Sequence, residues 1–163
     1  MPDIGVSGGG NMLRRLDQIA QGLDRGLEVR VGFLAGATYP DGTSVPLVAF
    51  INEYGRPFKG QPPRPFFRSM IAEKSGSWGA GLGQALRDSN YDARQALDRV
   101  GFGIEGQLRQ SIVEFTDPPL APSTVKRKSH GGTGPLHGVL GPSKPLVDTG
   151  HMLNSIDHEV TTT

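Results

Sequence analysis

Apolar residues recur along the chain at two characteristic spacings, which predict where helices and strands lie. A first helix is predicted between Asn11 and Gly26, where apolar side chains follow one another at steps of three and four: Leu13, Leu16, Ile19, Ala20 and Leu23. Alternation of apolar and other residues over 28–34 predicts a strand with one buried face. A second strand is predicted over residues 156–162, which are rich in β-branched side chains.

The middle of the chain is predicted to be mainly helical. Ser44 is expected to cap an amphipathic helix that ends at Gly55, and four apolar residues share one of its faces: Leu47, Phe50, Ile51 and Tyr54. Pro65 is expected to open the next helix, and the glycine-rich stretch 75–83 to interrupt or bend it. The longest helix is predicted over residues 91–115, with an apolar stripe formed by Leu97, Val100, Ile104, Leu108, Ile112 and Phe115.

Glycines interrupt the apolar stripe of that longest helix at positions 101, 103 and 106. Each weakens the helix by about 1 kcal/mol relative to alanine. In return, each leaves room for another backbone to approach closely. A further short helix is predicted over residues 123–129, with Ser123 as its cap.

Length and composition indicate one α+β domain. The 163 residues suit a single domain with a moderate core, in which residues 1–10 form a flexible lead-in and residues 11–163 the folded unit. An apolar content of 36%, with 24 glycines and 13 prolines, predicts long Pro/Gly-rich loops. A two-stranded sheet is marginal alone. The predicted small, mostly antiparallel sheet must therefore be packed against several helices, joined by strands hidden in the loops, or extended by a neighbouring subunit.

Charge and residue usage disfavour several classes of function. A net charge of +1 creates no general field that would attract nucleic acid or an anionic membrane. The chain contains no cysteine, so it has neither a disulfide framework nor thiolate chemistry. No apolar run approaches the roughly 20 residues of a membrane span, and residues 1–10 lack the pattern of a secretory signal. We therefore expect a protein that is made and used without export and has no membrane partner.

Neither a metal site nor a cofactor site is predicted. The histidines at positions 130, 137, 151 and 158 are irregularly spaced, which favours ordinary surface residues over zinc ligands. The glycine-rich stretches 76–83 and 134–144 lack either the preceding strand or the Gly-Lys-Ser/Thr of a phosphate-binding loop.

The triplet Asp148-Thr149-Gly150 allows two interpretations. Aspartic proteases present a catalytic carboxylate in such a triplet, but they need two carboxylates that share one proton. The 13 residues after Gly150 are too few to build the walls of such a site. The alternative is a structural role, in which Asp148 or Thr149 caps a short helix. Met152, Leu153 and Ile156 would then turn inward at helical spacing. We favour the cap.

A stiff loop over residues 56–68 is the most distinctive feature. Pro57, Pro62, Pro63 and Pro65 exclude a regular helix or a central strand there. Arginine and phenylalanine on a stiff exposed segment are typical of protein interfaces. The predicted interface residues are Arg56, Phe58, Arg64, Phe66 and Arg68. A second interpretation, compatible with the first, is that Phe66 and Phe67 anchor the loop to its own core.

Several short motifs appear in a fixed order between residues 31 and 156. They are an Asn-Glu-aromatic-Gly helix end at 52–55, a Pro-x-Arg-Pro-Phe loop at 62–66, a Pro-Ser-Thr turn with trailing lysines at 122–128, and the Leu-x-Asp-Thr-Gly ending with Ser-Ile at 146–156. Each motif is weak alone, but the ordered set resembles the neck and tail-completion proteins of long-tailed bacteriophages, also called virion morphogenesis or minor tail proteins.

The resemblance implies a structural virion protein without enzymatic activity, in which Asp148 is a conformational residue. It implies a homo-oligomer, a hexameric ring between the head connector and the tail tube, assembled in the host cytoplasm. The implied partners are other neck, connector, tail-tube and tail-terminator proteins, with genomic DNA passing through the lumen without sequence-specific binding. An alternative is a nucleic-acid-binding accessory protein that uses Arg56, Lys59, Arg64, Arg68 and the Lys-Arg-Lys turn at 126–128. A peptidase using Asp148 is the third hypothesis.

Overall fold

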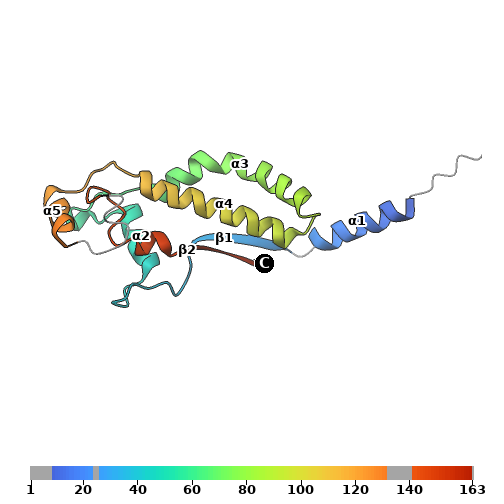
Figure 1. Cartoon of the computed structure of the whole chain (residues 1–163), viewed down its shortest axis with the longest axis horizontal. Coiled ribbons are helices and arrows are strands. Elements are labelled where there is room, and N and C mark those ends of the chain that lie inside the picture. Colours follow the sequence, from blue (N-terminus) through green and yellow to red (C-terminus); the bar gives the residue numbers. More distant parts are fainter. Residues whose placement is uncertain (1–8, 24–25, 132–140, 163) are drawn as a thin grey trace, which may run out of the picture.

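The computed structural model describes residues 9–23, 26–131 and 141–162 and has an α+β architecture (Figure 1). In chain order the elements are α1 (Gly9–Leu23), β1 (Leu27–Phe33), α2 (Val45–Tyr54), the short 3-10 helix η1 (Pro57–Lys59), α3 (Phe66–Asp88), α4 (Ala93–Glu114), α5 (Pro122–Gly131), α7 (His151–Asn154) and β2 (Ile156–Thr162). The predicted fold class is therefore confirmed. Positions 1–8 of the predicted lead-in lie outside the described residues, and Gly9 and Gly10 already belong to α1.

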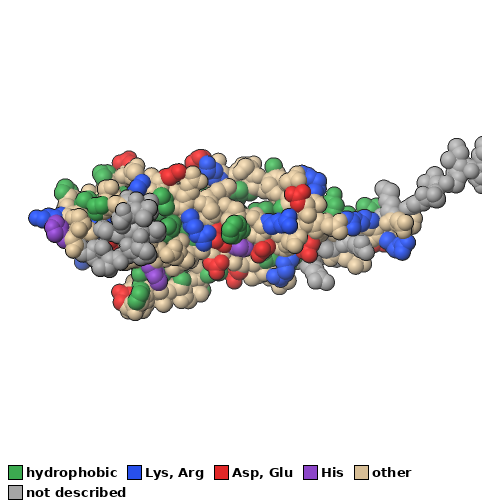
Figure 2. Space-filling view, viewed as in Figure 1, with side chains coloured by type: hydrophobic (Ala, Val, Ile, Leu, Met, Phe, Trp, Pro, Cys, Tyr) green, Lys and Arg blue, Asp and Glu red, His purple; other side chains and the backbone are tan. Residues whose placement is uncertain are grey.

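The two predicted strands pair with each other, although they lie at opposite ends of the chain. β1 and β2 are antiparallel, with a register that runs from Leu27 opposite Thr162 to Phe33 opposite Ile156. Helix α4 packs against both strands and also against α3, so it covers one face of the sheet. The other face carries Glu28, Arg30 and Glu159, which form ion pairs. Acidic and basic side chains are interspersed over the region of the strands (Figure 2).

The hydrophobic core lies where α2, the beginning of α3, the second half of α4 and the segment around α7 meet. Its buried members are Val45, Ala49, Phe66, Met70, Ile104, Leu108, Ile112, Leu146, Val147, Met152, Leu153 and Ile156. The inward orientation predicted for Met152, Leu153 and Ile156 is confirmed. This core is built mainly from residues distant in sequence, and it fixes α2 and α3 relative to each other.

Helix α3 differs from the prediction, because it runs without interruption through the glycine-rich stretch. With 23 residues it is one residue longer than α4. Packing against α4 offsets the low helix propensity of its glycines. Trp78 of α3 contributes to this packing and donates a hydrogen bond from Nε1 to Gln107 of α4 at 2.8 Å.

The ends of α2 agree with the prediction, but its buried face does not. The Ser44 hydroxyl accepts a hydrogen bond from Leu47 N at 3.4 Å, and the helix ends at Gly55. The buried residues are Val45, Ala49 and Glu53, at steps of four. Three of the four residues predicted to share an apolar face, Leu47, Phe50 and Tyr54, are instead exposed. The helix has two apolar stripes, and local periodicity cannot tell which of them meets the core.

Of two further predicted helix caps, the one at Ser123 is wrong, and the one at Asp148 or Thr149 holds for Thr149 alone. Helix α5 begins at Pro122, which places Ser123 inside the helix rather than before it. The residue preceding α7 is Gly150, in a left-handed conformation with φ 82°, and it has no side chain that could cap the helix. Of the two residues predicted to cap α7, Thr149 accepts a hydrogen bond through its hydroxyl from N of His151, the first residue of the helix, at 3.2 Å. Asp148 is exposed and makes no cap.

None of the described helices combines the length and the apolarity needed to cross a bilayer.

Candidate functional site

The most conspicuous surface feature is a group of exposed apolar side chains on α2 and η1, which we call the α2 surface. Its members and their exposed fractions are Leu47 (54%), Phe50 (60%), Tyr54 (50%) and Phe58 (103%). The rings of Phe50 and Tyr54 lie 4.6 Å apart, and the guanidinium of Arg68 lies 4.7 Å from the Tyr54 ring. Exposed apolar groups that gather on one side of a helix, as Leu47, Phe50 and Tyr54 do, typically mark interaction sites.

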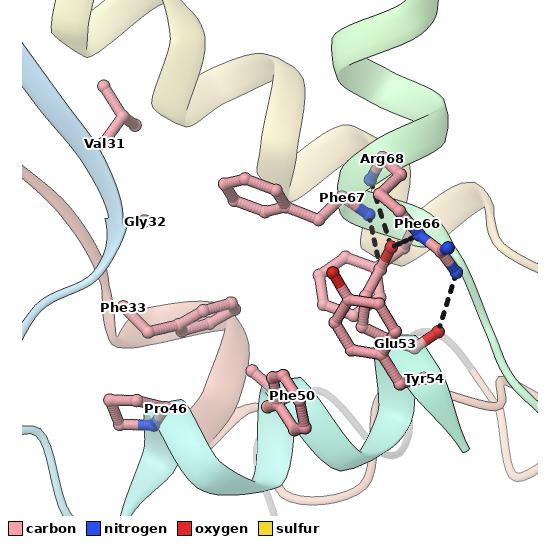
Figure 3. A pocket seen from close by; sticks show the side chains of 11 residues that line it. Val31, Gly32, Phe33, Pro46, Phe50, Glu53, Tyr54, Phe66, Phe67 and Arg68 are labelled. Carbon is pink, nitrogen blue, oxygen red and sulfur yellow. Dashed lines mark hydrogen bonds and ion pairs between the residues drawn. The ribbon is translucent and has the colours of Figure 1, made fainter.

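A groove continues the α2 surface toward the sheet (Figure 3). It has a volume of about 260 Å³ and is lined by Val31, Gly32 and Phe33 of β1, Pro46, Ala49, Phe50, Glu53 and Tyr54 of α2, and Phe66, Phe67 and Arg68 of α3. The close-up shows aromatic rings from all three elements around the opening. The groove is therefore a mainly apolar recess with an aromatic rim.

Glu53 holds this site together from within. Its carboxylate accepts hydrogen bonds from the main-chain nitrogens of Phe67, at 2.9 Å, and Arg68, at 3.2 Å. It also accepts one from Arg68 Nε at 2.7 Å. The two main-chain donors belong to the first turn of α3, whose preceding residue, Pro65, offers no side-chain cap. Glu53 therefore caps α3 from another helix, in the place where the helix dipole favours a negative charge.

Sequence reasoning missed this role of Glu53. Capping residues are sought next to the helix that they cap, and Glu53 precedes Phe67 by 14 positions. One signal was present, because Glu53 is the single charged residue of α2, whose other residues are apolar or aromatic except for Asn52. A lone acid on such a helix needs a partner when it is buried.

The structure separates the predicted interface residues into two groups. Arg56 and Phe58 are exposed on a small hairpin, closed by a bridge between Arg56 and Gln61. Arg68 is partly exposed, although its guanidinium is engaged by Glu53. The outward orientation predicted for Arg64 and Phe66 is wrong, since their exposed fractions are 6% and 1%.

Burial of Arg64 and Phe66 follows from the close return of the loop onto α2. Gly55, at the end of α2, allows this return, because a Cβ there would lie 2.7 Å from Gln61 O and from Pro63 N. Arg64 N then donates to Asn52 O at 2.8 Å. The Phe66 ring enters the core, where it meets Phe33 and Phe67 edge to face. Of the two interpretations of Phe66, the core anchor is correct.

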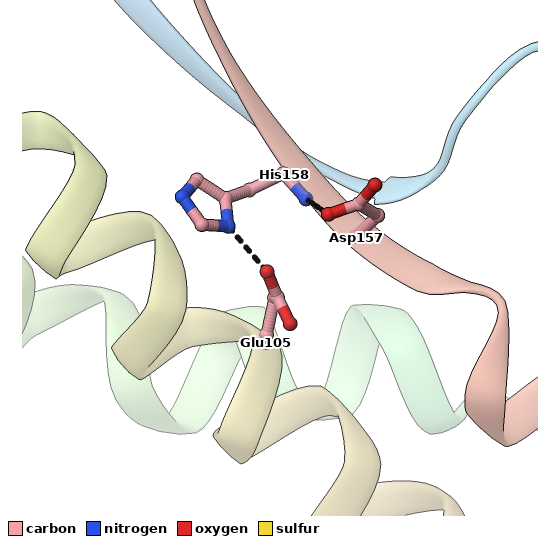
Figure 4. Close-up of side chains that lie close together, drawn as sticks. All are labelled: Glu105, Asp157 and His158. Carbon is pink, nitrogen blue, oxygen red and sulfur yellow. Dashed lines mark hydrogen bonds and ion pairs between the residues drawn. The ribbon is translucent and has the colours of Figure 1, made fainter.

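A second cluster of functional side chains joins β2 to α4 (Figure 4). His158 Nδ1 is hydrogen-bonded to the buried carboxylate of Glu105, and His158 Nε2 lies 3.1 Å from Asp98. The hydrogen bond to Glu105 raises the pKa of His158, an effect that burial opposes and Asp98 reinforces. His158 was predicted to be an ordinary surface residue, but the structure largely buries it: only 13% of its side chain is exposed.

The ligand atoms of this cluster are spaced as in a metal site, but a neighbouring positive charge disfavours a metal ion. Ligand atoms of Glu105, Asp157 and His158 lie within 4.8 Å of one another. However, Arg109 forms an ion pair with Glu105 at 2.5 Å and places a positive charge beside it. Both ring nitrogens of His158 are already engaged by carboxylates. The arrangement is therefore a hydrogen-bonded ion network that fastens the sheet to α4.

The remaining predicted residues lie apart from the α2 surface. Lys128, from the Lys-Arg-Lys stretch, is buried in α5 and donates from Nζ to the carbonyl oxygens of Lys144, at 2.8 Å, and Val147. Burial lowers the pKa of this lysine. His151 bonds to Thr38 O at 2.8 Å, and His137 lies outside the described residues.

No family model, curated protein or solved structure matches the chain.

Proposed function

We propose that this protein is a structural virion subunit of a long-tailed bacteriophage, a neck or tail-completion protein that assembles into a ring between head and tail. The ordered motifs between residues 31 and 156 support the family assignment. The observation that carries the assembly role is the α2 surface, where Phe50, Tyr54 and Phe58 are at least half exposed. Aromatic side chains on a folded support supply contact area at low entropic cost.

The chemistry of the groove supports binding rather than catalysis. Glu53 and Arg68 are its charged lining residues, and they form an ion pair with each other at 2.7 Å. Glu53 is further occupied by the main chain of α3. Neither group is free to act as a general acid or base, which requires a proton-transfer group within reach of a substrate.

Two of the four motifs that carry the resemblance, at 52–55 and 62–66, support this surface. Within Asn52-Glu53-Tyr54-Gly55, the glutamate caps α3 and the glycine admits the returning loop. Within the Pro62–Phe66 motif, Phe66 enters the core. The motif residues thus build the platform on which Phe50, Tyr54 and Phe58 are displayed.

The nucleic-acid-binding alternative finds less support in the placement of the basic residues. Sequence-independent binding requires several free cations to contact phosphates. Of the residues invoked, Arg64 and Lys128 are buried and Arg68 is paired with Glu53. Arg56, Lys59, Lys126 and Arg127 remain exposed.

The proposal is tested by assembly of the full-length protein. We expect light scattering after size-exclusion chromatography and negative-stain images to reveal closed rings. The double variant Phe50→Ser/Phe58→Ser should lose them while its circular dichroism is unchanged. Phe102→Ser is the matched control, because Phe102 is also exposed (69%) but lies on α4. A protein that never assembles, alone or with virion components, would contradict the proposal. Tight binding of duplex DNA that weakens steeply with salt would favour the alternative.

A further inference from the structure

Helix α1 carries leucine side chains that the described part of the chain leaves exposed. Its residues Leu13 and Leu16 have exposed fractions of 64% and 49%. The helix extends away from the end of the molecule that carries the turn between α3 and α4 (Figure 1). Arg15 contacts Asn90 of that turn by a hydrogen bond. Of the apolar residues predicted to share one side of α1, Leu13 and Leu16 therefore face solvent, whereas Ile19 is half-buried.

We propose that α1 of one copy binds along the α2 surface and its groove on a neighbouring copy. This inference rests on the proposed function, because it names the two surfaces through which subunits of the assembly would join. An amphipathic helix that lays its apolar side into an apolar groove is a common mode of protein recognition. Leucine side chains of α1 would meet Phe50, Tyr54 and the recess between β1 and α3.

The geometry of a single chain argues against α1 filling its own groove. α1 precedes the Leu27 end of β1, whereas the groove lies at the opposite end, around Phe33. Seven residues of strand separate these ends, a distance of about 23 Å. The contact between Arg15 and Asn90 keeps α1 at the remote end of the molecule.

The sheet offers α1 no alternative apolar face. One face of the sheet is covered by α4. The other carries the ion pairs of Arg30 with Glu28 and Glu159, whose side chains are 37–63% exposed. An apolar helix placed there would desolvate these charges without compensating them. Within the described part of the chain, the α2 surface and its groove are the exposed aromatic region that suits α1.

The estimated area of a single contact favours an assembly in which each subunit makes more than one contact. Helix α1 has 15 residues; it is therefore about 22 Å long and about 10–12 Å across, so one third to one half of its side surface is roughly 250–400 Å². A stable interface buries about 800 Å² on each partner. One contact falls short of this, so an isolated pair held by it alone would be weak. In a closed ring each subunit makes two such contacts, one through its own α1 and one through its α2 surface, and must release both to leave the assembly. Such head-to-tail contacts are the kind that closes into rings.

Site-directed disulfide cross-linking tests the proposal, because the natural chain contains no cysteine. Full-length Leu16→Cys protein is mixed with full-length Phe50→Cys protein of different tag length and oxidised. The matched control replaces Leu16→Cys by Arg14→Cys, since Arg14 lies on the polar side of the same helix. Both α1 positions and Phe50 are exposed, so the variants should fold; circular dichroism verifies this.

We expect the mixed Leu16–Phe50 disulfide to form in roughly tenfold excess over the Arg14–Phe50 product, because docking raises the effective concentration of the first pair. Equal yields, or no mixed product, would overturn the proposal. So would a double variant, Leu16→Cys/Phe50→Cys, that closes an internal disulfide in the monomer, because α1 would then cover its own groove. Rings seen in negative stain without the mixed disulfide would leave the proposed function intact and reject this interface alone.

Discussion

The imidazole of His158 lies directly over Gly101 of α4. A Cβ atom at position 101 would overlap this ring and would lie 2.9 Å from Val29 Cγ2. The close approach predicted for the glycines of this helix is thus found at Gly101, although side chains of the sheet rather than a backbone approach it. Nothing lies within 4 Å of a Cβ at Gly103 or Gly106.

Replacement of Gly101 by alanine should therefore destabilise the protein. Forcing a methyl group into a filled contact typically costs about 1–3 kcal/mol, which exceeds the gain of about 1 kcal/mol in helix propensity. The control is Gly103→Ala, which gains the propensity without a clash. Urea unfolding followed by circular dichroism measures both changes. Equal stabilisation by the two substitutions would show that β2 does not press on α4 as described.

The His158–Glu105 contact should make stability depend on pH. The folded-state pKa of His158 is raised above 6.5, first by the hydrogen bond to Glu105 and further by Asp98, with burial opposing both. Protonated His158 therefore contributes stability that is fully present below about pH 6.5. This contribution is lost as the pH rises through the raised pKa. The charged groups around the imidazole are Glu105, Asp98, Asp157 and, through Glu105, Arg109.

Urea midpoints measured between pH 5.5 and pH 8.5 check this dependence. We expect the free energy of unfolding of the natural chain to fall with rising pH, and His158→Gln to flatten that slope. His130→Gln, at an exposed position on α5, serves as the control and should keep the slope of the natural chain. If His158→Gln preserved the slope, the titrating group would lie elsewhere.

Glu53 should be essential for the junction between α2 and α3. Its carboxylate is 6% exposed and satisfies two main-chain nitrogens of α3. Glu53→Gln removes the charge and one acceptor, so we expect a loss of about 1–3 kcal/mol, and a larger loss for Glu53→Ala. Glu73→Gln is the control, because Glu73 is exposed and pairs with Lys74 at the surface; it should leave stability unchanged. Thermal unfolding distinguishes these cases, and equal melting temperatures for the Glu53 and Glu73 variants would refute the capping role.

Truncation of Phe66 and of Phe58 in the 56–68 loop should affect stability to very different extents. Phe66→Ala empties a core position that is 1% exposed, and such truncations cost about 3–5 kcal/mol. Phe58→Ser changes a fully exposed ring and should leave the melting temperature unchanged. Differential scanning calorimetry compares the two variants. A stable Phe66→Ala protein would indicate that this ring is not the anchor of the loop.

Thr149 should matter more than Asp148 for the structure of the Asp-Thr-Gly segment. Thr149→Val removes the hydroxyl that accepts a hydrogen bond from His151 N, which should cost about 0.5–1.5 kcal/mol. Asp148→Ala changes an exposed side chain without a capping role and should alter stability by less than about 0.5 kcal/mol. Chemical denaturation of the two variants decides between them. A greater loss for Asp148→Ala would show that Asp148, rather than Thr149, is the predicted cap.

Local signals in the sequence were sufficient for both strands and for most helix positions. Alternation over 28–34 and the β-branched run over 156–162 predicted β1 and β2 to within one residue. Ser44 and Gly55 correctly delimited α2. These features depend on side-chain periodicity and on hydrogen bonds between near neighbours, which a single stretch of sequence contains in full.

Contacts between distant segments determined the remaining features. Which apolar stripe of α2 is buried depends on how the core around Phe66 packs, because Val45 and Ala49 suit burial as well as Leu47 and Phe50 do. Glu53 caps a helix that begins beyond the proline-rich loop, and His158 meets Glu105 across 53 positions. Such pairings depend on the packing of whole elements against one another, so the spacing of residues within each element does not reveal them. The same packing turned Arg64 and Phe66 inward and left Phe58 exposed to solvent.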